Sequence, residues 1–264
     1  MLETFALKDK KILITGAMGL IGKSLCETLL KNGNEIIMID FKIDKKNSFF
    51  NELREKNIPI FDIDLSNKNK LTKFFQNQKK KLKGLNTVVN LAAMDRKIGS
   101  KNLFKKNFYD FEINYLKESI DNNLMSTVNI CQESCKFFIQ NKTKKANIIN
   151  IASTYSLVSS NPNLYEKNQN KPIDYIISKG SIPILSKYIA TNYAKQGIRC
   201  NCLIPHAVIK NPPKKFLTKF SKLSPIGRVC SIQEIIDPLI FLISDGSSYM
   251  TGSSLVVDGG WTAW

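Results

Sequence analysis

A tyrosine and a lysine four residues apart, Tyr175 and Lys179, are the side chains of this sequence best suited to proton transfer. Residues at i and i+4 share one face of a helix, so this spacing brings a phenol beside an ammonium. A tyrosine with an ordinary pKa of about 10 is a poor base at neutral pH, whereas a nearby cation favours its phenolate. An exposed aromatic residue beside a surface lysine would give the same spacing, so further residues are needed to define a site.

Two polar residues upstream are expected to reach the same place. Ser153 ends residues 150–153, a segment at the carboxyl end of a predicted strand, so its hydroxyl can point into a crevice there. Asn123 lies in a predicted helix whose apolar pattern carries it towards the same strand ends. A hydroxyl and an amide facing a phenol suit a reaction in which a proton leaves or joins an oxygen.

A glycine-containing string follows the first predicted strand and opens the first predicted helix, at residues 16–22. Glycines let such a turn bend, and they let backbone N–H groups and a helix N-terminus approach a pyrophosphate. Asp40 ends the second predicted strand eighteen residues after Gly22, where its carboxylate can accept hydrogen bonds from the adenosine ribose and would repel a 2′-phosphate. The sequence therefore favours NAD over NADP, although Lys42 and Lys45 lie close enough to weaken this preference.

Further candidates for cofactor contacts follow the third and fourth predicted strands. Asp64 and Leu65 could contact the adenine edge, and Asn90 and Ala92 lie where small residues would admit the cofactor. Their common placement at strand carboxyl ends predicts one ligand crevice there.

The elements that must position these residues alternate along the chain. Apolar runs predict strands at residues 11–15, 35–40, 58–62, 87–91, 146–152, 198–204 and 254–258, and helical patterns include residues 23–31, 120–140, 174–195 and 232–242. This alternation predicts an α/β fold with a doubly wound, seven-stranded parallel sheet and a crevice at its carboxyl edge.

Composition and charge exclude several classes of protein. The 264 residues are 43% hydrophobic and 23% charged, as in an ordinary globular domain. The net charge of +17 would suit nucleic acid, but no nucleic-acid-reading motif accompanies it, so we expect no nucleic-acid partner. No apolar run could span a membrane and the opening residues do not resemble a secretion signal, which predicts a cytoplasmic protein. With one histidine, the six cysteines are expected to be reduced thiols and no metal site is expected.

Taken together, these motifs resemble the short-chain dehydrogenase/reductase superfamily over nearly the whole chain. The matching segments are residues 15–22, 64–65, 90–93, 123–124, 150–153, 175–179, 197–205, 225–228, 247–252 and 257–260. By this resemblance, Asn123, Ser153, Tyr175 and Lys179 form a catalytic tetrad. Tyr175 would be the acid/base and Ser153 would bind the substrate oxygen. Lys179 would hold the nicotinamide ribose and lower the pKa of Tyr175, while Asn123 would anchor a proton-relay water.

The resemblance also implies a single Rossmann domain over residues 1–264, assembled as a homodimer or homotetramer. It implies exchange of a hydride between C4 of the nicotinamide and a secondary carbon of the substrate. The implied cofactor-binding residues are Gly16, Met18, Gly19, Leu20, Ile21, Asp40, Asp64, Leu65, Asn90, Ala92, Tyr175, Lys179, Pro205 and Val208.

Departures from the family pattern affect the glycine string and the choice of tyrosine. Leu20 stands where most members have glycine and Gly19 where they do not, a spacing closer to the extended branch that modifies sugar nucleotides. The segment between Ser153 and Tyr175 is longer than is usual in the family, and it contains a second tyrosine, Tyr165. Tyr165 has Gln169 rather than a lysine four residues on, so Tyr175 is the predicted catalytic tyrosine.

Two segments, residues 94–120 and 156–172, are longer than the minimal fold requires. We expect both to overhang the nicotinamide end, where their Lys, Asn and Tyr content suits a polar or anionic ligand; oligomer contacts or solvated lids would explain them equally well. His206 stands where the family usually has glycine, and a catalytic role for it is one hypothesis. Pro183 predicts a kink in the helix that carries Lys179.

The expected activity is NAD-dependent oxidation of a secondary alcohol or reduction of a ketone, on a sugar, sugar acid or nucleotide sugar in surface-glycan synthesis. Residues 258–264 resemble a subgroup associated with flagellin or surface-glycan modification. Two alternatives remain. An epimerase or dehydratase that retains NAD would share the Tyr/Lys pair and the glycine spacing, and a non-catalytic module would bind the nucleotide alone.

Overall fold

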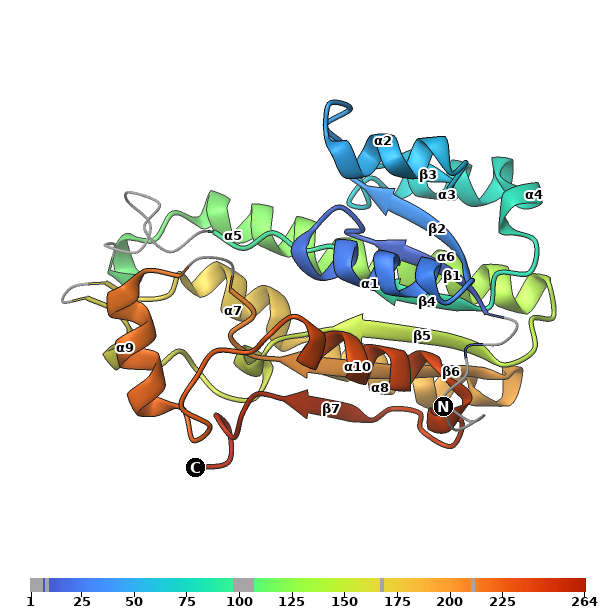
Figure 1. Ribbon diagram of the computed structural model, residues 1–264. Coiled ribbons are helices and arrows are strands. Elements are labelled where there is room, and N and C mark those ends of the chain that lie inside the picture. Colours follow the sequence, from blue (N-terminus) through green and yellow to red (C-terminus); the bar gives the residue numbers. More distant parts are fainter. Residues whose placement is uncertain (1–6, 8–9, 97–106, 167–168, 210–211) are drawn as a thin grey trace.

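The apolar runs of the sequence form one parallel sheet of seven strands, in the order β3-β2-β1-β4-β5-β6-β7 (Figure 1). The structure is a computed structural model that describes residue 7 and residues 10–96, 107–166, 169–209 and 212–264. The strands are β1 (Lys11–Thr15), β2 (Glu35–Asp40), β3 (Ile60–Asp62), β4 (Thr87–Asn90), β5 (Ala146–Ile151), β6 (Ile198–Pro205) and β7 (Ser254–Val257). The predicted single Rossmann-like α/β domain with a seven-stranded parallel sheet is confirmed.

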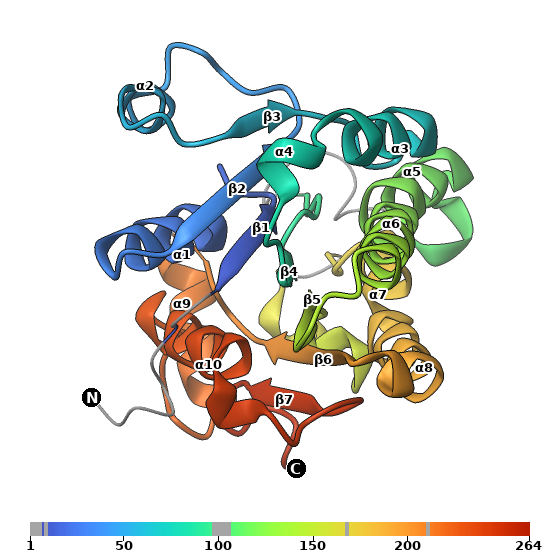
Figure 2. The same cartoon turned by 90° about the vertical axis from the view of Figure 1, so that its right-hand side faces the viewer.

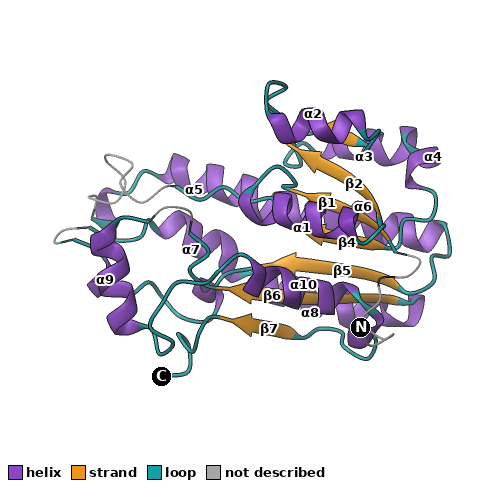
Figure 3. Ribbon diagram, in the orientation of Figure 1, coloured by secondary structure: helices purple, strands orange, loops and turns teal. Residues whose placement is uncertain are grey.

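Helices lie on both faces of this sheet (Figures 2 and 3). They are α1 (Leu20–Lys31), α2 (Ser48–Glu55), α3 (Lys68–Asn77), α4 (Lys79–Leu82), α5 (Ile113–Ser119), α6 (Ser126–Gln140), α7 (Ile173–Gly180), α8 (Ile182–Tyr193), α9 (Lys214–Leu223) and α10 (Gln233–Ile243). In the end-on view of Figure 2, α1 and α10 lie on one face, and α3, α6 and α8 lie on the other.

The inner strands are apolar on both faces because both faces are covered. Successive strand residues point to opposite sides, so Leu13 and Ile37 enter the core under α3, α6 and α8. Ile14 and Met38 enter the second core, under α1 and α10. All four side chains are fully buried, which explains the continuous rather than alternating apolar pattern of these strands.

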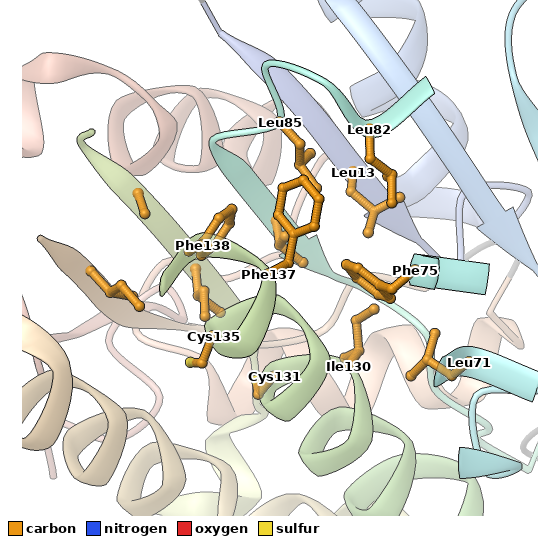
Figure 4. Close-up of a cluster of buried hydrophobic side chains, with 14 of the residues drawn as sticks. Leu13, Leu71, Phe75, Leu82, Leu85, Ile130, Cys131, Cys135, Phe137 and Phe138 are labelled. Carbon is orange, nitrogen blue, oxygen red and sulfur yellow. The ribbon is translucent and has the colours of Figure 1, made fainter. Parts of the chain in front are cut away.

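Aromatic rings and thiols fill the core under α3 and α6 (Figure 4). Phe75 of α3 lies 5.9 Å from Phe137 of α6, measured between ring centroids. Cys131 and Cys135 are buried there on one face of α6, as their helical spacing predicts. All six cysteines of the chain are free in the structure.

Two predicted helices differ from those observed. Helical structure begins at Ile113 rather than at residue 120, and a π-helical segment (Ile120–Met125) joins α5 to α6. The helix expected over residues 174–195 is divided at Ser181, and Pro183 lies in the first turn of α8. Proline is tolerated in a first turn because its missing N–H would have no helical partner there, so the chain breaks before the proline instead of kinking at it.

The strand order reverses between β1 and β4, which are neighbours in the sheet although β2 and β3 separate them along the chain. In doubly wound sheets, such a switch point opens a crevice at the carboxyl ends of the strands. The segments that follow β1, β4, β5 and β6 therefore meet at one edge of the sheet.

Candidate active site

A cavity of about 960 Å³ lies at this edge. Its described lining includes Leu20 and Ile21 after β1, Ala93 after β4, and Ser153 after β5. It also includes Tyr155, Tyr175, Lys179, Pro205, His206 and Val208. The structure thus brings Ser153, Tyr175 and Lys179, three of the four predicted catalytic residues, to one cavity of the size of a small-molecule site.

The glycine string is required by close backbone contacts. Gly16 has φ +64°, and a Cβ there would lie 2.6 Å from the backbone nitrogen of Ala92. A Cβ on Gly22 would lie 2.2 Å from the carbonyl oxygen of Gly16. Gly19 precedes the first turn of α1 and has no side chain to cap it, so first-turn N–H groups of α1 are available for a phosphate.

Two carboxylates lie at the ends of β2 and β3 as predicted, Asp40 as the last residue of β2 and Asp64 two residues after β3. Asp40 accepts hydrogen bonds from the backbone N–H groups of Met18 and Phe41, both at 2.7 Å. An ionised carboxylate offers about four acceptor positions, so Asp40 can still accept ribose hydroxyls. Asp64 accepts from the N–H and the hydroxyl of Ser66, at 2.9 and 2.6 Å. These contacts fit a dinucleotide that lies across the glycine string with its adenosine end towards β2.

Three of the other predicted cofactor contacts have packing roles. The Asn90 amide donates to Asn150 Oδ1 at 2.7 Å and is 3% exposed, so its side chain joins β4 to β5 within the sheet. The Leu65 side chain is buried in the core under α3 and α6. Ala92 packs against Gly16 through its backbone, where a larger residue in the string would collide.

Tyr175 lies in the first turn of α7 and faces the cavity. Burial raises the pKa of Tyr175 above its ordinary value, and the nearby Asp95 carboxylate raises it further. A hydrogen bond with Ser153 acts in the opposite direction. The ring of Tyr155 stands perpendicular to the Tyr175 ring, with centroids 6.2 Å apart. In this protein as it stands, Tyr175 is therefore a neutral phenol, able to donate a proton.

Lys179 lies one helical turn beyond Tyr175 and is 2% exposed. Its ammonium donates to the Ile151 carbonyl at 2.7 Å, and burial lowers its pKa to about 8. Lys179 lies in the last turn of α7, before the division at Ser181, and this hydrogen bond holds its ammonium at the carboxyl end of β5. Its predicted effect on the pKa of Tyr175 remains a prediction, because the ammonium is directed at a carbonyl here.

Asn123 is fully buried in the π-helical segment and does not line the cavity. Its amide oxygen accepts from the Met94 N–H at 2.6 Å, and its amide nitrogen donates to the Met94 carbonyl at 3.0 Å. The same nitrogen donates to the Ser178 hydroxyl at 2.9 Å. Asn123 therefore links the loop after β4 to α7, and the wider π turn, a feature often found at functional sites, brings its amide to that position.

His206 lines the cavity, and its Nδ1 lies 2.7 Å from the Thr154 hydroxyl. Its ring lies 4.6 Å from that of Trp261, near the carboxyl end of the sequence. Burial lowers the pKa of His206 to about 4, so the imidazole is neutral at pH 7. A catalytic role for His206 remains a hypothesis.

Sequence reasoning missed a charged pair beside Tyr175. The Lys171 ammonium lies 4.6 Å from the centre of the Tyr175 ring and 2.5 Å from Asp95 Oδ1. Both residues line the cavity, and they belong to the two long segments predicted to shape the pocket. A signal was present, since Lys171 precedes Tyr175 by four residues, just as Lys179 follows it by four. Residues 97–106 and 167–168 of these segments lie outside the described residues.

Residues 16–262 match a family model described as enoyl-(acyl carrier protein) reductase. The chain is a short-chain dehydrogenase/reductase. A flagellin modification protein A of Campylobacter coli is 28% identical to this dehydrogenase/reductase over 97% of this chain and 99% of that protein. An NAD-dependent glycerol dehydrogenase of Listeria innocua is 25% identical over 98% and 96% of the two chains.

Solved structures agree. A short-chain dehydrogenase of Leptospira borgpetersenii with bound NAD⁺ superposes with a TM-score of 0.83 and 25% identity, covering 99% of this chain and 96% of that one. This dehydrogenase/reductase is accordingly an NAD(P)-dependent oxidoreductase, and the predicted family and enzyme class are confirmed. Among the residues that the structure describes, no helix is long and apolar enough to cross a membrane.

Proposed function

We propose that this dehydrogenase/reductase uses NAD to interconvert a secondary alcohol and a ketone on a sugar, sugar acid or nucleotide sugar in surface-glycan synthesis. The observation that carries this proposal is the convergence of Ser153, Tyr175 and Lys179 on one cavity. The likeness to a flagellin modification protein supports a role in surface-glycan synthesis. The Asp40 carboxylate at the end of β2 supports NAD, because it would repel a 2′-phosphate.

The residues of the cavity suit the proton transfer of this reaction. The Ser153 hydroxyl can bind the reacting oxygen, and the Tyr175 hydroxyl can give that oxygen a proton or take one from it. Lys179 would hold the nicotinamide ribose, while Asn123 orients the loop after β4 against α7. A bound nicotinamide dinucleotide supplies the two-electron oxidation or reduction of the carbon. The first turn of α1 would hold its pyrophosphate.

We also propose that the protein acts in the cytoplasm as a homodimer or homotetramer. Ile177 of α7 and Ile184 and Tyr188 of α8 are 43%, 65% and 61% exposed. Large apolar side chains that gather on neighbouring helices favour contact with a second copy of the chain. Their exposure supports the α7 and α8 surface as that contact.

The test is a screen of ketosugars and nucleotide-activated ketosugars with NADH and with NADPH, followed by loss of the reduced cofactor's absorbance. We expect turnover with NADH, and we expect Tyr175→Phe to lower kcat by about a hundredfold or more because the proton donor is lost. Tyr249→Phe is the matched control, since Tyr249 is fully exposed. Absence of turnover on the whole panel, or full activity of Tyr175→Phe, would contradict the proposal.

A further inference from the structure

The pair of Asp95 and Lys171 differs from an ordinary surface ion pair in its burial and its position. The Lys171 side chain is 6% exposed, whereas that of Asp95 is 47% exposed, and their charged atoms are 2.5 Å apart. The Lys171 ammonium also lies over the ring of Tyr175. The lysine is thus the fixed member of the pair, and the carboxylate is the member that a ligand in the cavity can reach.

The charge of Asp95 acts on two tyrosines that line the cavity with it, Tyr155 and Tyr175. Burial raises the pKa of both Tyr155 and Tyr175, and the charge of Asp95 adds to the shift in each. A group bound between these two hydroxyls would therefore meet a carboxylate. That carboxylate accepts hydrogen bonds from substrate hydroxyls and repels a substrate anion.

The cations of the cavity are already engaged by other groups. Arg96 donates to Asp174 at 3.1 Å and to Glu118 at 2.7 Å. Lys179 donates to a backbone carbonyl, and Lys171 is paired with Asp95. These are the positive side chains among the described residues that line the cavity, so a substrate carboxylate or phosphate beside Tyr175 would meet cations that other groups already hold.

We propose that Asp95, held in place by Lys171, binds a hydroxyl group of the substrate next to the reacting carbon. The site then selects an uncharged, polyhydroxylated ketone or alcohol around that carbon, and any acidic or phosphate group of the substrate lies away from it. Aromatic walls suit the C–H faces of such a molecule, and Tyr155, Tyr165, His206, Phe216 and Phe220 provide them. The inference rests on the proposed function, because it assumes that Tyr175 marks the reacting carbon.

The test compares three six-membered ring ketones that differ only in their substituents. The first is an inosose, in which each ring carbon except the ketone carbon carries a hydroxyl. The second is cyclohexanone, which has no other substituent, and the third is 3-oxocyclohexanecarboxylate. Steady-state reduction by NADH is measured for the wild-type protein and for the variants Asp95→Asn, Lys171→Gln and Lys171→Arg. Asp95→Asn keeps the size of the side chain and removes its charge.

A matched control pair lies at the opposite end of the sheet. Lys10 and Asp245 are 2.7 Å apart, with side chains 5% and 42% exposed, which nearly reproduces the burial of Lys171 and Asp95. Asp245 also pairs with Lys145 at 2.9 Å, so Asp245→Asn reports what the loss of an ion-pair contact at least as extensive as that of Asp95 does through stability alone. It should leave the relative rates on the three ketones unchanged.

We expect Asp95→Asn to lower kcat/KM for the inosose by about ten- to a hundredfold, the effect of one hydrogen bond to a charged group. Its kcat/KM for cyclohexanone should change by less than about threefold, and that for the carboxylate should rise, since the repelling charge is gone. Lys171→Gln should also lower kcat/KM for the inosose, because Asp95 loses the partner that holds it, but it should not raise kcat/KM for the carboxylate, because the charge of Asp95 remains. Lys171→Arg should keep the wild-type preference.

The possible results separate the two proposals. The wild-type protein could reduce the inosose while Asp95→Asn leaves the ratio of kcat/KM for the inosose to that for cyclohexanone unchanged. This result overturns the role of Asp95 and leaves the proposed function intact. A higher kcat/KM of the wild type for the carboxylate than for the inosose also overturns the role of Asp95. Reduction of none of the three ketones by the wild-type protein overturns this inference, whereas the proposed function is contradicted only by the absence of turnover on the whole ketosugar panel.

Discussion

Replacement of Lys179 by methionine should stabilise the cofactor-free protein at neutral pH while it abolishes activity. Lys179 is buried, and its ammonium has the Ile151 carbonyl as a hydrogen-bond partner at 2.7 Å. Methionine has a similar length and needs no hydrogen bond. Residues that serve catalysis often reduce stability, and the proposed role of Lys179 makes this buried lysine a quantitative case.

The magnitude follows from the pKa of Lys179, which burial lowers from an ordinary value of 10.5 to about 8. At about 1.4 kcal/mol for each pKa unit, the buried ammonium costs about 3 kcal/mol of the free energy of unfolding at pH 7. Loss of the hydrogen bond to Ile151 offsets about 1 kcal/mol of the gain. Lys179→Met should therefore be more stable than the wild type by about 2 kcal/mol at pH 7.

The sign of the pH dependence is fixed by the same pKa values. Below pH 8 the lysine is protonated in both the folded and the unfolded protein, so the full penalty applies. Between pH 8 and 10.5 the folded protein releases the proton while the unfolded chain keeps it, so the penalty decreases. The advantage of Lys179→Met should therefore shrink as the pH rises and vanish at about pH 10, where the remaining penalty equals the contribution of the lost hydrogen bond.

The assay is urea unfolding followed by far-ultraviolet circular dichroism, at pH 7 and at a pH close to 10. Lys187→Met serves as the control, because Lys187 is an exposed lysine on the following helix. A Lys179→Met protein that is less stable than the wild type at pH 7 would refute this reasoning. So would a stability difference that stays constant between the two pH values.

Three further predictions concern the glycine string, the histidine and the cofactor preference. Gly16→Ala should lower the free energy of unfolding by about 2 kcal/mol or more and weaken NADH binding, because the new Cβ would meet the Ala92 backbone at 2.6 Å. Urea unfolding measures the first effect and fluorescence titration the second. Burial lowers the pKa of His206 from 6.5 to about 4, so the unfolded chain binds a proton before the folded protein does as the pH falls. The free energy of unfolding of the wild type should therefore decrease by about 3 kcal/mol between pH 6.5 and pH 4. His206→Gln should lack this part of the decrease when urea unfolding at pH 7 is compared with urea unfolding at pH 4.5. Asp40→Ser should raise the NADPH to NADH ratio of kcat/KM by about tenfold or more, and an unchanged ratio would show that Asp40 does not select the cofactor.

Local patterns were sufficient to predict much of the fold. The seven strands and their parallel direction follow from apolar runs separated by helical patterns, and the inner runs are continuous because these strands are buried on both faces. The pair of Tyr175 and Lys179 needed only the period of one helix. The break at Ser181 was less accessible, since the sequence shows Pro183 but not whether the chain kinks at it or ends a helix before it.

Contacts between distant segments account for what the sequence left open. Asn90 looked like a cofactor contact from its place at a strand end, yet only the register of β4 against β5 shows that its amide is paired with Asn150. Asn123 reaches Met94 because the helix widens into a π turn, which no local propensity indicates. Trp261 reaches His206 across 55 positions of sequence.

The sequence by itself determined the apolar strands, the glycine turn and the helical spacing of the candidate pair Tyr175 and Lys179, because each depends on neighbours within a few residues. Tertiary structure alone decided which charges surround Tyr175. Asp95 and Lys171 are separated by 76 residues and lie on different segments, and their pairing depends on how those segments fold over the sheet edge. Electrostatic interactions in a buried site depend on distances through space and on exclusion of water, and neither quantity can be obtained from the order of residues.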